Sequence, residues 1–274
     1  MQLNPRYGSD PILTLDGDLS LIAETTTRQN RRLGAMLATL TDDQWAHPTR
    51  CSEWDVRDVI VHLGFTNRFW TMSVMAGLDG DPTRALASFD PVASPLQMGA
   101  GNVDPPSVVL EGFLEASNTW CELLASISAE GWRQTGEAPP GHISIGAVVH
   151  HALWDSWVHE RDISLPLGEA PTEDADEVLM SLRYAVALGA TLAISHGTGG
   201  AGAVTFDVAR PDSIFSLSVG EVAAIETGAI DGAPVITADA VALLEGISMR
   251  ATMPITPSRD IAWVFGGLKA AFDR

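Results

Sequence analysis

Four amphipathic stretches in the first 165 residues restrict the fold of this chain more than any other feature of the sequence. Apolar side chains recur every three or four residues over 19–40, from the expected N-cap Asp55 to about Met75, over about 107–129 and over about 143–163. This spacing puts them along one side of a helix, where they must be buried against other helices. Together with a long connection over 77–106, the four stretches predict a four-helix bundle.

The pattern changes after Ile163. A segment rich in proline, glycine and acidic residues, LPLGEAPTEDADE, precedes a helix predicted over about 174–195. The segments AVTFDVA and IFSLSV alternate apolar and polar residues, which predicts two half-buried strands. Further helices are expected near 238–247 and 259–272. The sequence thus predicts an α+β protein, with the bundle over 18–165 and a smaller domain over 174–274.

Charge and cysteine content argue against several classes of protein. The chain has 16 basic and 35 acidic residues, a formal net charge of −19 and no run of Lys or Arg, so it should repel nucleic acid and anionic membranes. Two cysteines, Cys51 and Cys121, are too few for a disulfide scaffold, and we expect both to be ordinary core residues. There is no signal-peptide pattern and no stretch of eighteen apolar residues, so we expect a cytoplasmic protein without a membrane span.

Three polar side chains are expected to point into the bundle. His62 lies near the line of Val59, Phe65 and Phe69 on the second helix, a line expected to face the interior. Asp155 and His159 are four residues apart on the fourth helix, so their side chains project one above the other. A carboxylate and an imidazole at this spacing can bind one metal ion, with a third ligand from a facing helix. A cation would also offset the cost of burying an Asp among apolar residues.

The spacing alone leaves other roles open. His62 can be a hydrogen-bonded core residue, and Asp155 and His159 can form a salt-bridged pair or bond Arg161. His151, one turn before Asp155, can be a further ligand, a group that orients the ligands, a proton carrier or a solvated helix residue.

The segment LTDDQWAHPTRCSEWDVRDVIVHLGFTNRFW carries a family resemblance. It resembles the opening of the mycothiol-dependent maleylpyruvate isomerase family, part of the DinB-like bundle superfamily, in which an "LTDxxW" turn is followed by "PTxCxxWxVxDVxxHL". Every defined position of these motifs is present and in order: Leu40 to Trp45, then Pro48, Thr49, Cys51, Trp54, Val56, Asp58, Val59, His62 and Leu63. The resemblance covers about residues 18–165 well and the C-terminal part only loosely, in VTFDV and in ALLEGISMR, which ends at Arg250.

The resemblance implies a metal site. In the family the His of "HL" is a metal ligand, which corresponds to His62. The other two ligands come from a Glu-x-x-x-His pattern, which corresponds here to Asp155 and His159, with an Asp that is one methylene shorter than the family's Glu. Three protein ligands leave a coordination position open, as in catalytic zinc sites. Zinc is favoured, and nickel, cobalt or manganese also suit nitrogen and oxygen ligands.

The resemblance also implies a DinB-like four-helix bundle followed by a smaller α/β domain of sterol-carrier-like type. Mycothiol would be the thiol cosubstrate, and its metal-activated thiolate would attack a small electrophile in an isomerisation or a thiol transfer.

The expected catalytic residues are His151, Asp162 and Arg250. Asp162 matches the family's trailing Asp and can orient a ligand or cap the helix end. Arg250 can hold a carboxylate of the substrate or thiol, or lie on the surface. We expect a monomer or homodimer. The alternatives are a metal-dependent hydrolase that uses metal-bound water, and a non-catalytic protein that binds a small ligand.

Overall fold

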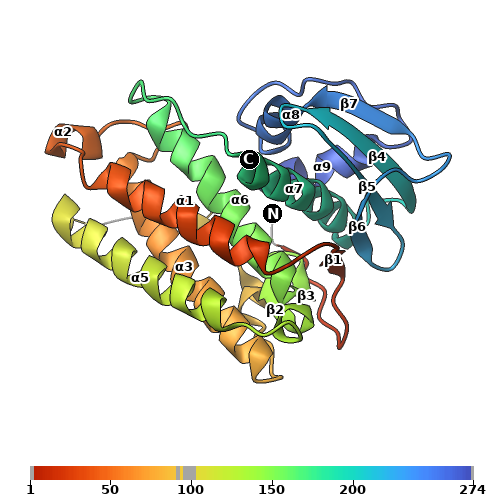
Figure 1. The fold of residues 1–274 in the computed structure, drawn as a ribbon, viewed down its shortest axis with the longest axis horizontal. Coiled ribbons are helices and arrows are strands. Elements are labelled where there is room, and N and C mark those ends of the chain that lie inside the picture. The colour runs from red at the N-terminus through yellow and green to blue at the C-terminus, as the bar shows by residue number, and fades with distance from the viewer. Residues whose placement is uncertain (1–2, 91–92, 95–102, 273–274) are drawn as a thin grey trace.

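The computed structural model describes residues 3–90, 93–94 and 103–272. The predicted four-helix bundle is confirmed, and it consists of α1 (Leu21–Leu37), α3 (Val56–Leu78), α5 (Pro106–Ser126) and α6 (Ile145–Ser164) (Figure 1). Shorter elements connect these helices: α2 (Asp42–Trp45), the 3-10 helices η1 (Ala85–Ser88) and η2 (Gly131–Arg133), and the hairpin β2 (Thr135–Ala138) and β3 (Gly141–Ser144). The hairpin was not predicted, and part of the expected long connection lies outside the described residues.

Four strands of the C-terminal part and one strand from before the bundle form a five-stranded sheet, so the predicted α+β class is confirmed. Its strands follow the order β1-β6-β5-β4-β7. The bounds are β1 (Leu13–Leu15), β4 (Gly202–Ala209), β5 (Ser213–Val219), β6 (Ala223–Thr227) and β7 (Val235–Asp239). Strands β4, β5 and β6 form an antiparallel meander, whereas β1 and β7 run parallel to their neighbours. The two predicted strands correspond to β4 and β5; β6 and β7 were not predicted.

Helix α7 (Ala175–Ser195) lies between the bundle and the sheet (Figure 1). It packs against α6 on one side and against α8 (Ala240–Ile247) and α9 (Ala262–Phe272) on the other. A Cβ atom on Gly267 would lie 1.9 Å from the carbonyl oxygen of Gly189, so the close approach of α7 and α9 requires glycine there. Of the helices that the structure describes, α7 alone is long and apolar enough to cross a membrane, and 78% of its most apolar window is buried inside the molecule. This burial is typical of a core helix.

The segment before the bundle belongs to the sheet. Leu13 and Leu15 of β1 are buried, and β1 pairs with β6 with Leu13 opposite Ala223. One hydrophobic core runs from Trp120 in the bundle through α7 to Phe206 in the sheet. The predicted limits 18–165 and 174–274 stay predictions, and they leave β1 outside both parts.

The predicted N-cap Asp55 is confirmed at the start of α3. Its carboxylate accepts a hydrogen bond from the backbone N–H of Asp58 at 2.9 Å, and the Asp58 carboxylate accepts one from the backbone N–H of Asp55 at 3.2 Å. This capping box satisfies two N–H groups that the helix leaves unpaired. It therefore fixes the first turn of the helix that carries His62.

Replacing Asp55 with Ala should lower the free energy of unfolding by about 1 kcal/mol, because the N–H of Asp58 loses its acceptor. Urea denaturation of the two proteins measures this difference. Asp55→Asn, which keeps an acceptor oxygen, should lose less. Equal stability of Asp55→Ala and the native chain would contradict the capping role.

Candidate metal centre

His62 on α3 and the pair Asp155 and His159 on α6 converge on one point. His62 Nε2 lies 3.5 Å from Asp155 Oδ2, and His159 Nε2 lies 3.6 Å from Asp155 Oδ1. One ligand atom from each residue lies within 4.8 Å of the others. Two ligands at about 2.1 Å from a tetrahedral zinc ion are about 3.4 Å apart, and each imidazole lies close to that distance from one of the two Asp155 oxygens.

The three side chains are mostly shielded from water. They keep 13%, 16% and 9% of their surface exposed for His62, Asp155 and His159. The Trp54 ring lies 5.2 Å from the His62 ring and 6.2 Å from the His159 ring, and so covers both imidazoles. Burial alone would raise the pKa of Asp155. The hydrogen bond and charge of His62 and the charge of His159 outweigh this effect and bring the pKa well below its ordinary value. Asp155 is therefore ionised, as a metal ligand must be.

The line of apolar residues expected beside His62 does not face the interior along its whole length. Val59 is fully buried, whereas Phe65, one turn beyond His62, is 45% exposed. His62 thus lies at the edge of the buried face of α3. Periodicity predicts which side of a helix is apolar. It does not predict how far along the helix that side stays buried.

Asp162 lies directly behind His159. The Asp162 carboxylate is fully buried and its Oδ2 lies 3.1 Å from His159 Nδ1. A carboxylate on the far nitrogen of a histidine ligand fixes the tautomer and the ring orientation. The expected orienting role of Asp162 agrees with this geometry, whereas a helix-capping role is wrong, because its side chain bonds other side chains and not the backbone of α6. In contrast, His62 Nδ1 is buried without a hydrogen-bond partner among the described residues.

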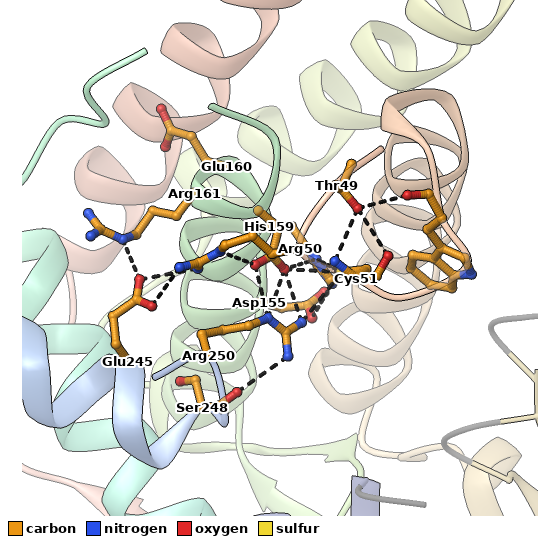
Figure 2. A network of polar contacts seen from close by, with 12 residues as sticks. Thr49, Arg50, Cys51, Asp155, His159, Glu160, Arg161, Glu245, Ser248 and Arg250 are labelled. Atoms are coloured by element: carbon orange, nitrogen blue, oxygen red, sulfur yellow. Dashed lines mark hydrogen bonds and ion pairs between the residues drawn. The ribbon is translucent and has the colours of Figure 1, made fainter. Parts of the chain in front are cut away.

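Arg250, labelled in Figure 2, belongs to the C-terminal part of the chain and pairs with Asp162. Its Nε lies 2.9 Å from Asp162 Oδ1 and its Nη2 lies 3.0 Å from Asp162 Oδ2, a two-pronged pair that Arg forms with carboxylates. Met249 has the left-handed backbone value φ 60°, which turns the chain sharply after α8 and directs Arg250 toward the bundle. The alternative of a surface Arg250 is therefore wrong.

A second buried carboxylate, Glu245 on α8, joins the same network (Figure 2). Glu245 accepts hydrogen bonds from Arg50 Nη1 at 2.8 Å and from Arg161 Nε at 2.5 Å. Arg50 also donates to Asp162 Oδ1 at 3.0 Å. Arg161 pairs with Glu245 and Glu173, so the alternative in which it bonds Asp155 or His159 is wrong.

Cys51 was expected in the core, but its thiol lies in this network. It is 3.1 Å from Asp162 Oδ2 and 3.5 Å from Arg250 Nη2, and it forms with His159 and Asp162 a second group able to hold a metal. Two guanidinium groups already contact Asp162, and they would repel a cation there. The group of His62, Asp155 and His159 is therefore the better metal site. The place of Cys51 inside the Pro48–Leu63 motif was the signal in the sequence for its position.

His151 lies on α6 one turn before Asp155. It is 4% exposed, so the alternative of a solvated helix residue is wrong. Its Nδ1 lies 2.6 Å from the hydroxyl of Tyr184 on α7, and its ring packs 4.7 Å from that of Trp70. Burial lowers the pKa of His151 to about 4, so the imidazole is neutral at neutral pH. His151 does not belong to the group formed by His62, Asp155 and His159. Its position therefore favours a role beside the metal site over a role as a ligand.

Comparison with known proteins gives one matching family model and matching crystal structures. Residues 26–164 match the model of the family described as the mycothiol maleylpyruvate isomerase N-terminal domain. No curated protein shows significant sequence similarity. A crystal structure of the mycothiol-dependent maleylpyruvate isomerase is 13% identical and has a TM-score of 0.61, over 89% of this chain and 94% of that chain.

A second crystal structure, of a His-to-Ala mutant of that isomerase, also has a TM-score of 0.61. It is 12% identical and covers 86% of this chain and 91% of that chain. Both matches extend over the bundle and the sheet. At these identities they show a shared fold.

The affinity of the site for a divalent metal should rise with pH. Burial alone would lower the pKa of His159, but Cys51, Asp162 and Asp155 outweigh it and raise that pKa well above 6.5. At neutral pH a metal must therefore displace a proton from His159, so affinity should fall about tenfold for each pH unit below that pKa. Zinc titrations between pH 6 and 8, in buffers of different ionisation enthalpy, should show proton release. A pH-independent affinity would contradict the assignment of His159 as a ligand.

Proposed function

The chain belongs to the mycothiol maleylpyruvate isomerase N-terminal domain family, and from this membership we propose that it is a metal- and mycothiol-dependent enzyme acting on a small electrophile. The reaction would be an isomerisation or a transfer of the thiol. The observation that carries the proposal is the convergence of His62, Asp155 and His159, with two separations that suit tetrahedral coordination. Zinc is the favoured metal for this set of ligands, and nickel, cobalt or manganese are alternatives.

The three ligands leave room for an exogenous group on the metal. When bound, a divalent ion would lower the pKa of a coordinated thiol, so that mycothiol is a thiolate at neutral pH. Asp155 stands where the family pattern has Glu. Its carboxylate nevertheless reaches toward both imidazoles, because Oδ1 and Oδ2 face different histidines. The shorter side chain is thus compatible with the same three-ligand site.

Asp162 and His159 act as a unit in this proposal. Asp162 is ionised, since His159 and Arg250 lower its pKa more than burial raises it. With a proton on Nδ1 directed at Asp162, His159 presents the lone pair of Nε2 to the metal site. The carboxylate would hold the ligand in one orientation without contacting the substrate itself.

Arg250 is placed to bind an anionic group of the substrate or thiol. Its Nε and Nη2 are engaged with Asp162, while Nη1 makes one long contact, 3.4 Å, to the carbonyl oxygen of Ser248. Nη1 is thus available to a carboxylate, and the pair with Asp162 fixes the guanidinium in advance. A thiolate that adds to an activated double bond moves an electron pair onto the conjugated oxygen atom. Arg250 and the neutral His151 are the nearby groups that would stabilise that charge.

The partners that we propose are a small-molecule substrate and a low-molecular-weight thiol. The net charge of −19 disfavours nucleic acid and anionic membranes. We place the enzyme in the cytoplasm, where thiol cosubstrates are kept reduced, as a monomer or homodimer.

Metal analysis of the purified protein tests the proposal directly. The native chain should contain one divalent ion, and His159→Ala should bind zinc at least about 100-fold more weakly because a ligand is lost. Calorimetry should show mycothiol binding only to the metal-loaded native protein. His196→Ala, a change at the C-terminal end of α7, is the matched control and should leave both affinities unchanged.

Two results would count against the proposed metal- and mycothiol-dependent activity. A native protein that holds no metal removes the basis of the proposal. A protein that holds metal and ignores mycothiol favours the hydrolase alternative.

Substitutions of Asp155 separate the effect of its negative charge on zinc affinity from the effect of its side-chain length. Asp155→Asn should lower zinc affinity by at least about 100-fold, because the ligand loses its negative charge. Asp155→Glu, which installs the carboxylate of the family pattern, should retain zinc within about tenfold of the native affinity. Competition with a chromogenic chelator measures both values. Loss of zinc from Asp155→Glu as severe as from Asp155→Asn would show that this site does not accept the family ligand.

A further inference from the structure

Tyr184 contacts His151, one of the expected catalytic residues, from outside the bundle. It lies on α7, is completely buried, and its hydroxyl is 2.6 Å from His151 Nδ1. Among the described residues, His151 is the one hydrogen-bond partner of this hydroxyl. Neither the metal ligands nor the network around Asp162 includes Tyr184.

The hydroxyl determines which nitrogen of His151 carries the proton. Burial raises the pKa of Tyr184, so the phenol keeps its proton, and a buried O–H group needs an acceptor. The acceptor within reach among the described residues is His151 Nδ1, so Tyr184 donates and Nδ1 accepts. A neutral imidazole whose Nδ1 accepts a hydrogen bond carries its proton on Nε2.

The packing of the ring sets the direction of this N–H group. The His151 ring is held between Trp70 of α3, at 4.7 Å, and Tyr184 of α7, at 5.2 Å. Because the two nitrogens of an imidazole point to opposite sides of the ring, Nε2 is turned away from Tyr184 and α7. It makes no hydrogen bond to a residue that the structure describes. His151 lies one turn before Asp155 on the same face of α6, next to the three candidate ligands.

We propose that Tyr184 is a positioning residue that holds His151 as the Nε2–H tautomer, so that this N–H group serves as a hydrogen-bond donor to a substrate at the His62, Asp155 and His159 site. The group that it recognises is an oxygen atom on which negative charge develops during reaction. A preorganised donor of this kind stabilises such charge without reorganising. The part of this inference that concerns the substrate rests on the proposed function, whereas the tautomer and the direction of Nε2 do not.

Tyr184→Phe is the decisive variant, because it keeps the ring in the core and removes the O–H group. The other tyrosine provides the control. Tyr7 donates to Glu137 Oε1 at 2.7 Å, so Tyr7→Phe removes a comparable hydrogen bond without touching His151.

Nitrogen-15 NMR of the imidazole gives the first measurement. The native protein should show His151 protonated on Nε2 alone, Tyr184→Phe should show a mixture of the two tautomers, and Tyr7→Phe should resemble the native protein. A native His151 that is protonated on Nδ1 overturns the inference, as does an unchanged tautomer in Tyr184→Phe. The native spectrum decides the tautomer even where the variant fails to fold.

Paramagnetic relaxation in the cobalt-loaded protein gives the second measurement. The Nε2 proton of His151 should relax faster than the ring protons of Tyr184, because it lies on the side of the metal. Slower relaxation of that proton overturns the proposed direction.

The third measurement uses maleylpyruvate with mycothiol as the probe reaction. Tyr184→Phe should lower kcat about 10- to 100-fold with unchanged zinc affinity, whereas Tyr7→Phe should not. Equal kcat in the native protein and Tyr184→Phe overturns the positioning role. Absence of turnover in the native protein counts against the proposed function, and the two NMR measurements then still decide the role of Tyr184.

Discussion

A carboxylate without access to water, that of Asp162, is the feature on which the architecture of the candidate site depends. An ionised group at such a depth is tolerated only when charged partners and hydrogen bonds replace the lost water. Asp162 obtains these from His159 on its own helix, from Arg50 before α3 and from Arg250 after α8. The three partners come from segments far apart in the sequence. The pair with Arg250 therefore forms only when the C-terminal part has packed against the bundle.

The same network connects the C-terminal part to the candidate site, whose three proposed metal ligands all lie in the bundle. Glu245 on α8 binds Arg50 and Arg161, and the sharp turn at Met249 brings Arg250 to Asp162. The added strand β1 and the continuous core through α7 connect the two parts further. A metal bound at His62, Asp155 and His159 would lie next to this rigid ionic cluster. One of its ligands, His159, would be oriented by Asp162 before the metal binds, which favours affinity.

Prediction from the sequence succeeded where local periodicity is strong and failed where structure depends on distant partners. The long helices were predicted because their apolar stripes and caps are local signals, as with Asp55. Strands β1, β6 and β7 are three to five residues long, too short for an alternation of apolar and polar residues to be recognised, and β1 and β7 pair with strands that do not adjoin them in the sequence. The exposure of Phe65 was missed because helical spacing gives a direction but not the edge of the buried face.

By itself, the sequence determined the helical bundle and the change to an α+β part, because both depend on residues within a few positions of one another. It also predicted that His62 lies with Asp155 and His159, because a dense motif carries that relation. Only the tertiary structure decided that Cys51 and Arg250 meet at Asp162, that Arg161 pairs with Glu245, and that Tyr184 bonds His151. These contacts join residues separated by between 33 and 111 positions. Residues that far apart in the chain form no periodic pattern that a sequence could show. The cost of burying charge selects their partners only after the helices have packed.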